Sequence, residues 1–323
     1  MHSFLGEVRI LNRRAWTARW KDRTLSGDTA RQVIGRCSSR DDPDAEVEAG
    51  LALRTLAWQA TWRGDFEEAT THALAAERRL DERRFPVERG DVYSILGIIH
   101  CSRCRNDLAE SAVERGLEIL PRGNDKAIGS YIDLLIAKAT IQRHKGQLAK
   151  SNVTLGAALQ MAERGELARV ENNAARCILA DNKPAAALEH AVRAADLAEE
   201  FENKVVQPYT AEVLADCLWR LGKYEEAESS FATGLKLALR ERDRRAQCQL
   251  LQRKGLMEMA RGNNRQALDL FRQSAILAER MVYGLWYKEL ALNMATAHEM
   301  MGNLASALSA HKLAWRIWQN PNF

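Results

Sequence analysis

The chain is poor in the features that mark membrane spans, sheets and secreted domains. Only 6 of its 323 residues are proline, so long helices meet few interruptions. No stretch of 18 uninterrupted apolar residues occurs, so we expect no transmembrane helix. No alternating run of β-branched residues is long enough to predict a strand. The first ten residues include Glu7 and Arg9 and so lack the apolar core of a secretory signal. We therefore expect a cytoplasmic protein.

Motifs that carry catalysis or hold cofactors are also missing. The seven histidines form no HExxH pair, and the chain has no P-loop, no GxGxxG after a strand and no GxSxG elbow. Catalytic groups can assemble from distant positions, but a regular sequence without motif or inserted domain argues against catalysis. The sequence predicts no enzyme, no catalytic residue, no cofactor and no metal.

The six cysteines are scattered, as expected in a reducing compartment. Cys101-Ser-Arg-Cys104, beside His100, has half the spacing of a zinc site, but no second half follows. The favoured interpretation is that both cysteines are small residues filling a packed turn. A redox pair or metal half-site is the alternative.

What the chain does contain is a turn motif with a period near 40 residues. Its clearest copies are Gly64-Asp-Phe-Glu-Glu-Ala69 and Gly222-Lys-Tyr-Glu-Glu-Ala227. The seven turn positions are Gly64, Cys104, Gly146, Asn182, Gly222, Gly262 and Gly302. Such self-similarity predicts a solenoid, in which each repeat buries its apolar face against its neighbours. Ala, Leu, Arg and Glu dominate the composition, and they are good helix formers, so the repeats should be helical.

Small residues recur at fixed offsets from every turn position. The residues seven before, five after and twelve after the seven turn positions are all Gly, Ala or Ser. Antiparallel helices approach closely only where the facing side chains are small. The pattern therefore predicts a helix-turn-helix hairpin with a tightly packed seam in each repeat.

This pattern resembles the tetratricopeptide repeat family, over roughly residues 50–318. HEAT and armadillo repeats share the period but do not require small residues around a glycine turn. Repeats three and four depart from the family pattern, because Leu148 and Pro184 replace the turn aromatic. The long period is similar to that of the helical regions that precede bacterial GGDEF cyclase domains. The resemblance implies an all-α fold: a right-handed α-solenoid of about seven helix-turn-helix repeats with an N-terminal capping helix or half repeat.

We expect three segments: a basic cap with a half repeat (residues 1–48), the solenoid (49–318) and a short tail (319–323). Residues 1–40 hold nine Lys or Arg against three acidic residues, whereas the remainder holds 38 basic and 40 acidic residues. Trp16 and Trp20 lie four apart within this basic segment. It can be a cap that packs its Trp side chains on the first repeat and keeps its arginines in water, with a half repeat at Gly27. A nucleic-acid or membrane-surface segment is the alternative, and we regard nucleic acid as the less expected partner.

In this family the first helices of the hairpins line the concave surface, which locates a candidate groove. The fourth repeat offers a polar stripe at i, i+3, i+4 and i+7, formed by Arg169, Asn172, Asn173 and Arg176. Asparagine is a mediocre helix former, so two in mid-helix suggest that their amides are used. The candidate groove residues are Arg143, Arg169, Asn172, Asn173, Arg176, Tyr209, Glu212, Asp216 and Trp219. They can bind an extended peptide, or they can satisfy one another across the groove.

Two functions stay open at this point. The first is a non-enzymatic interaction or sensory module of a bacterial signalling system, whose output domain, of diguanylate-cyclase type, would be lost or on another chain. The second is a regulator that binds a peptide in the groove and changes superhelical shape. Both predict a protein or peptide partner, and a homodimer is compatible with either.

Overall fold

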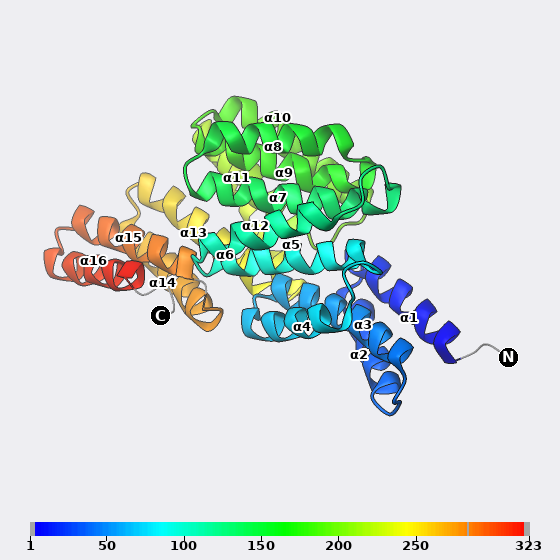
Figure 1. Ribbon diagram of the computed structural model, residues 1–323. Coiled ribbons are helices and arrows are strands. Elements are labelled where there is room, and N and C mark those ends of the chain that lie inside the picture. Colours follow the sequence, from blue (N-terminus) through cyan, green and yellow to red (C-terminus); the bar gives the residue numbers. More distant parts are fainter. Residues whose placement is uncertain (1–3, 283, 320–323) are drawn as a thin grey trace.

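The computed structural model describes residues 4–282 and 284–319 and shows helices joined by short turns, with no strand in those ranges. The repeats form seven hairpins: α3 (Pro43–Arg63) with α4 (Phe66–Arg79), α5 (Pro86–Ser102) with α6 (Asn106–Ile119), α7 (Ile128–His144) with α8 (Leu148–Met161), α9 (Arg164–Ala180) with α10 (Pro184–Glu200), α11 (Gln207–Arg220) with α12 (Tyr224–Arg240), α13 (Arg244–Ala260) with α14 (Asn264–Arg280), and α15 (Gly284–Met300) with α16 (Leu304–Gln319). Two helices precede them, α1 (Phe4–Ala18) and α2 (Arg23–Cys37), and a 3₁₀ turn η1 (Asp125–Ala127) leads into α7. The predicted α-solenoid is confirmed (Figure 1).

All seven predicted turn positions lie between the two helices of a hairpin and have positive φ. Glycine adopts this conformation without strain, and asparagine tolerates it. Cys104 (φ 58°) and Asn182 (φ 56°) take the same backbone shape as the glycines. The positive φ of the turn is therefore kept in every repeat, including the two repeats in which another residue replaces glycine.

The small-residue seam is confirmed as well, because all twenty-one positions are buried. The contact at Gly255 shows why size matters there. A Cβ atom at this position would lie 2.5 Å from the ring of Phe271 on the partner helix. Close helix packing therefore depends on the missing side chain.

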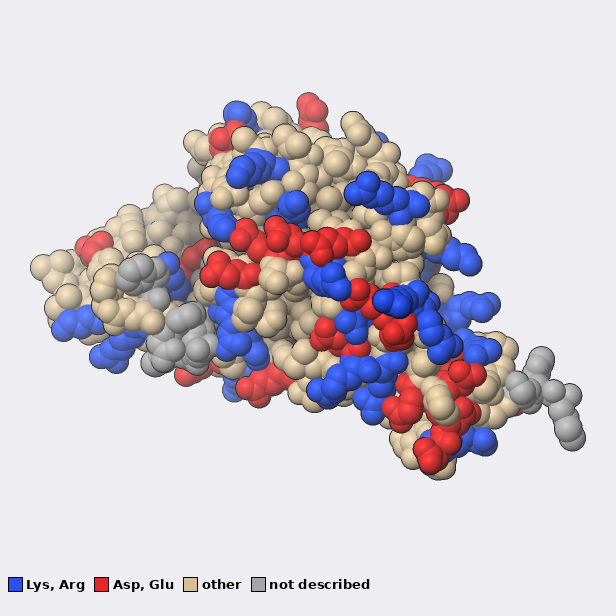
Figure 2. All heavy atoms as spheres, viewed as in Figure 1, with Lys and Arg blue, Asp and Glu red and all other residues tan. Residues whose placement is uncertain are grey.

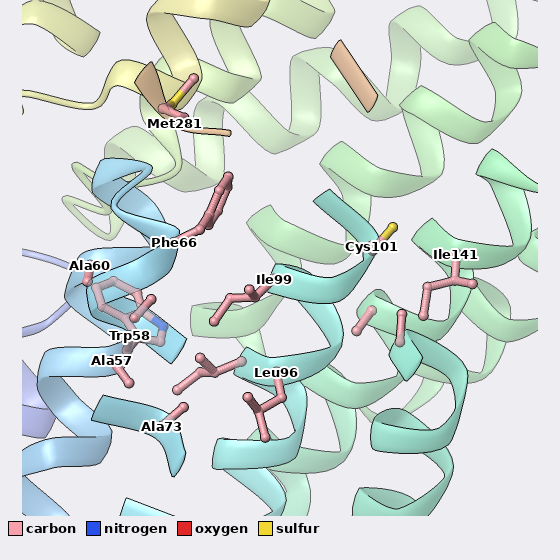
Figure 3. Close-up of a cluster of buried hydrophobic side chains, with 14 of the residues drawn as sticks. Ala57, Trp58, Ala60, Phe66, Ala73, Leu96, Ile99, Cys101, Ile141 and Met281 are labelled. Atoms are coloured by element: carbon pink, nitrogen blue, oxygen red, sulfur yellow. The ribbon is translucent and has the colours of Figure 1, made fainter. Parts of the chain in front are cut away.

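The chain also closes on itself after the hairpins have made one turn. Helix α13 contacts α3, and α15 contacts α5. Arg244 at the start of α13 pairs with Asp65 at 2.9 Å, and the Trp62 and Tyr209 rings lie 5.4 Å apart. Figure 3 shows Met281, which follows α14, in one buried cluster with Phe66 and Trp58. The outcome is a ring of hairpins around an inner channel.

The N-terminal helices form part of this ring. Val8, Ala15 and Val33 pack with the start of α3, as a cap would. Two details of the predicted cap are wrong. Gly27 lies inside α2 and forms no half-repeat turn, because the chain already turns between α1 and α2. The arginines are not all in water, since Arg23 is buried against Asp243.

Charge is mixed on the outer surface. On the face drawn in Figure 2, Lys and Arg alternate with Asp and Glu over the N-terminal helices. No helix in the described part of the chain is long and apolar enough to cross a membrane. The predicted tail, residues 319–323, lies almost wholly outside the described residues.

Candidate functional site

The inner channel holds a cavity of about 120 Å³. Its lining comes from α1 and the turn that follows it, from the first helix of every hairpin, and from the turn that leads into α11. These helices therefore face the channel, as predicted. Five tryptophans border the cavity: Trp16, Trp20, Trp58, Trp62 and Trp286.

Six of the nine predicted groove residues line this cavity: Arg143, Arg169, Asn172, Asn173, Arg176 and Tyr209. Glu212 and Asp216 are buried outside the lining: Glu212 pairs with the lining residue Arg176, whereas Asp216 pairs with Arg220, which is not part of the lining. Trp219 lies outside the lining, with the guanidinium of Arg220 6.0 Å from its ring. The four stripe residues of α9 thus line one cavity, and they differ in what they contact: Arg169, Asn172, Asn173 and Arg176.

Two of the predicted arginines are engaged by carboxylates of the same chain. Arg169 forms an ion pair with Asp133, and Arg176 forms one with Glu212. Arg253 also approaches Glu212, at 3.4 Å. For Arg176, the structure thus shows the pairing with Glu212 that the sequence left open as an alternative to ligand binding.

Of the two asparagines, one is engaged within its own helix and the other keeps an acceptor without a donor among the described residues. Asn173 donates from Nδ2 to the carbonyl oxygen of Arg169 at 2.8 Å, so its amide serves its own helix. Asn172 is only 5% exposed, and its Oδ1 accepts no hydrogen bond from any described residue. A buried acceptor without a donor is costly and rare in native proteins. Asn172 is therefore the stripe residue best suited to a ligand.

Arg143 and His144 end helix α7 and meet Cys101 of α5 in the channel. Arg143 donates from Nη2 to His144 Nε2 at 3.0 Å, and His144 Nδ1 lies 3.3 Å from Cys101 Sγ. A guanidinium only donates, so Nε2 must accept and the ring proton lies on Nδ1. Burial and the nearby arginines hold the pKa of His144 well below its ordinary value, so the ring is neutral at pH 7.

This arrangement does not activate the cysteine. His144 already carries its proton on the nitrogen that faces Cys101, so it cannot take the thiol proton there. Burial raises the pKa of Cys101 to about 11. Cys104 lies in the hairpin turn, and no group of three or more His, Cys, Asp or Glu in the described ranges could hold a metal ion. The packed-turn interpretation suits Cys104, whereas Cys101 lies in the last turn of α5 and borders the channel.

The sequence did not predict how far the tryptophans gather. Trp20 lies 4.7 Å from Trp58 and 6.0 Å from Trp62, between ring centroids. The Arg169 guanidinium lies 4.5 Å from the Trp20 ring, a cation–π contact between the N-terminal segment and repeat four. The sequence signals were the four-residue spacings of Trp16 with Trp20 and of Trp58 with Trp62, and neither spacing reveals that the two pairs meet.

Comparison with known proteins places the fold. No family model matches the chain, and no curated protein does. Among solved structures, a Rap protein complexed with Competence and Sporulation Factor is similar over 98% of this chain and 86% of its own, with 15% identity and a TM-score of 0.74. The Rap conjugation gene regulator of plasmid pLS20, in complex with the Phr* peptide, is similar over 98% of this chain and 96% of its own, with 13% identity and a TM-score of 0.63.

A signal transduction ATPase with a tetratricopeptide repeat sensor, from Pyrococcus horikoshii, covers 96% of this chain and 48% of its own, with 16% identity and a TM-score of 0.53. At such identities the likeness concerns the fold. None of these three structures is described as part of a GGDEF cyclase, so that resemblance gains no support. The chain is an α-solenoid built from repeats of tetratricopeptide type.

Proposed function

We propose that this protein is a regulatory module that binds an extended peptide or protein tail in its inner channel. The observation that carries the proposal is Asn172, a buried residue of the channel lining whose Oδ1 has no donor among the described residues. A peptide backbone supplies N–H donors at regular spacing and would satisfy it. Two solved structures of the same fold hold a named factor or peptide, which is consistent with this use of the fold.

The size of the cavity bears on the mechanism. Sites for drug-sized ligands commonly enclose about 300–1,000 Å³, whereas this one measures about 120 Å³. An extended peptide therefore requires the ring to widen where α3 meets α13. The contacts that would separate are Arg244 with Asp65 and Trp62 with Tyr209. Binding is in this way coupled to superhelical shape, because a ligand that prefers the wider ring shifts its population.

A non-enzymatic role remains a prediction, as does location in the cytoplasm. An output domain on another chain is equally untested, and so are nucleic-acid binding and a homodimer. The peptide proposal depends on none of them.

The experiment is affinity selection from a synthetic library of random hexapeptides on the immobilised full chain, read by mass spectrometry. Wild type should retain a defined subset of sequences. Asn172→Ala should lose most of that subset. Asn152→Ala should keep it, because Asn152 is exposed on α8, the second helix of its hairpin. Retention that is the same for all three proteins would refute the proposed site, and no retention by wild type would refute the function.

A further inference from the structure

The cavity lining carries more positive than negative charge. It includes four arginines, at 143, 169, 176 and 245, and two aspartates, at 91 and 133. Asp133 is engaged by Arg169. Asp91 accepts from Arg54 at 2.8 Å and from Ser130 at 2.6 Å. The two carboxylates of the lining are therefore already engaged, and the lining residues taken by themselves carry a formal charge of +2.

Arg143 is where this surplus is most clearly uncompensated. Its hydrogen bond goes to the neutral ring of His144, and no described carboxylate lies within ion-pair distance of it. Its side chain is largely enclosed, and the surface that it keeps borders the cavity. Burial, and then the charge of Arg176, lower the pKa of Arg143 to about 10, a sign of how unfavourable its charged form is here.

A largely enclosed cation without a countercharge is costly, and an apolar side chain in its place removes that cost. Ionisable groups held in such unfavourable surroundings cluster at functional sites. The guanidinium offers a planar fork of N–H donors, which matches the two oxygens of a carboxylate. The geometry and the charge thus both select an anion of this shape.

The rest of the lining indicates what accompanies the anion. Ile98 and Ile136 border the same cavity as the five indole rings, so an apolar group is accommodated beside the charge. We propose that Arg143 is a carboxylate subsite of the channel, which binds a terminal or side-chain carboxylate whose neighbouring apolar group lies among the tryptophans. The proposal deepens the peptide function above by naming the chemistry that the ligand presents.

A small ligand tests the subsite apart from peptide binding. We would titrate 3-phenylpropionate and, separately, 3-phenylpropionamide into the full chain and follow tryptophan fluorescence. Wild type should bind the acid at least about tenfold more tightly than the amide, as for a charge-assisted contact. Arg143→Met should abolish the difference, whereas Arg272→Met, on the exposed face of α14, should keep it. Equal binding of acid and amide by wild type, or no binding of either, would overturn the subsite.

Arg143→Met should also fold with an undiminished melting midpoint, because it removes a costly charge. If it fails to fold, Arg143→Lys replaces it as the test variant, since lysine keeps the charge but loses the fork. Binding of the acid should then weaken at least fivefold. Unchanged binding by a folded Arg143→Lys would count against the subsite.

Three hexapeptide libraries identify the source of the carboxylate: free acids without Asp or Glu, amides with Asp and Glu, and amides without either. Wild type should retain members of the first or the second library, which shows whether the terminal or the side-chain carboxylate is bound, and none of the third. Equal retention of the third library would overturn the subsite and leave peptide binding intact. Retention of no library, with 3-phenylpropionate still bound, would overturn the peptide function and leave the subsite intact.

Discussion

Arg23 Nη1 lies 3.4 Å from Asp243 Oδ2, and this buried ion pair joins the second helix to the start of α13, 220 residues further along the chain. Asp243 also accepts from the Tyr209 hydroxyl at 3.1 Å and caps α13 by accepting from Ala246 N at 2.8 Å. One carboxylate thus links the N-terminal cap, α11 and α13. The pair of Arg23 with Asp243 is thus one of the contacts that close the ring.

Arg23→Met should therefore destabilise the protein by about 3–5 kcal/mol, because it leaves a buried carboxylate without its cation. Urea denaturation followed by circular dichroism measures the loss. Arg31→Met is the matched control, since Arg31 is exposed on the same helix, and it should change stability by less than about 0.5 kcal/mol. Equal midpoints for Arg23→Met and wild type would show that the pair does not hold the ring.

Ala227 lies fully buried in the seam between α11 and α12. Ala227→Leu should overpack the seam and cost roughly 1–3 kcal/mol, with helical content kept at low temperature. Ala232→Leu makes the same change on the exposed face of α12 and should have little effect. A thermal midpoint that falls equally in both variants would contradict the seam.

His144 predicts a specific pH dependence of stability. Burial, and then Arg143, Arg245 and Arg176, lower its pKa in the folded state. Below pH ~6.5, His144 therefore binds a proton in the unfolded chain but stays neutral in the folded chain. This contribution to stability is present above pH ~6.5 and falls by about 1.4 kcal/mol for each unit of acidification below it, until the folded-state pKa is reached.

The measurement is urea denaturation of wild type and His144→Gln between pH 7.5 and 5. Other groups titrate in this range, so the difference between the two proteins isolates His144. Wild type should lose more stability on acidification than the variant does. Parallel pH profiles would mean that His144 titrates in the folded protein as it does in the unfolded chain, and would contradict the lowered pKa.

Deleting residues 1–40 should expose Trp58 and Trp62 and cause aggregation or partial melting, because these helices cap the first repeat. Circular dichroism of the deletion beside gel shifts across a salt series separates the cap from a nucleic-acid segment. A deletion that stays folded and loses only salt-sensitive binding of DNA or RNA would contradict the cap.

The fold was predictable because it repeats. Seven copies of one pattern average out local exceptions, so even Cys104 and Asn182 were placed correctly in hairpin turns. The contents of the channel were less predictable, because they depend on which distant side chains meet. A helical stripe places Asn172 and Arg176 on one face, but only the folded ring shows that Glu212 occupies Arg176 and that Asn172 keeps an acceptor free of described donors.

The closure of the ring could not be predicted either, because it also depends on contacts between residues far apart in the sequence. A small rotation between hairpins accumulates along a solenoid, and no local pattern says that the first hairpin meets the sixth and the second meets the seventh. The contacts of Arg23 with Asp243 and of Trp62 with Tyr209 follow from that accumulated curvature.

Calorimetric titration of the best-retained hexapeptide into wild type, Asn172→Ala and Asn152→Ala is the most direct test of channel binding. Losing a buried hydrogen bond of about 1–2 kcal/mol should weaken the affinity of Asn172→Ala roughly five- to thirtyfold. Asn152→Ala should bind as wild type does. Wild-type affinity in Asn172→Ala would contradict the account and place the peptide outside the channel.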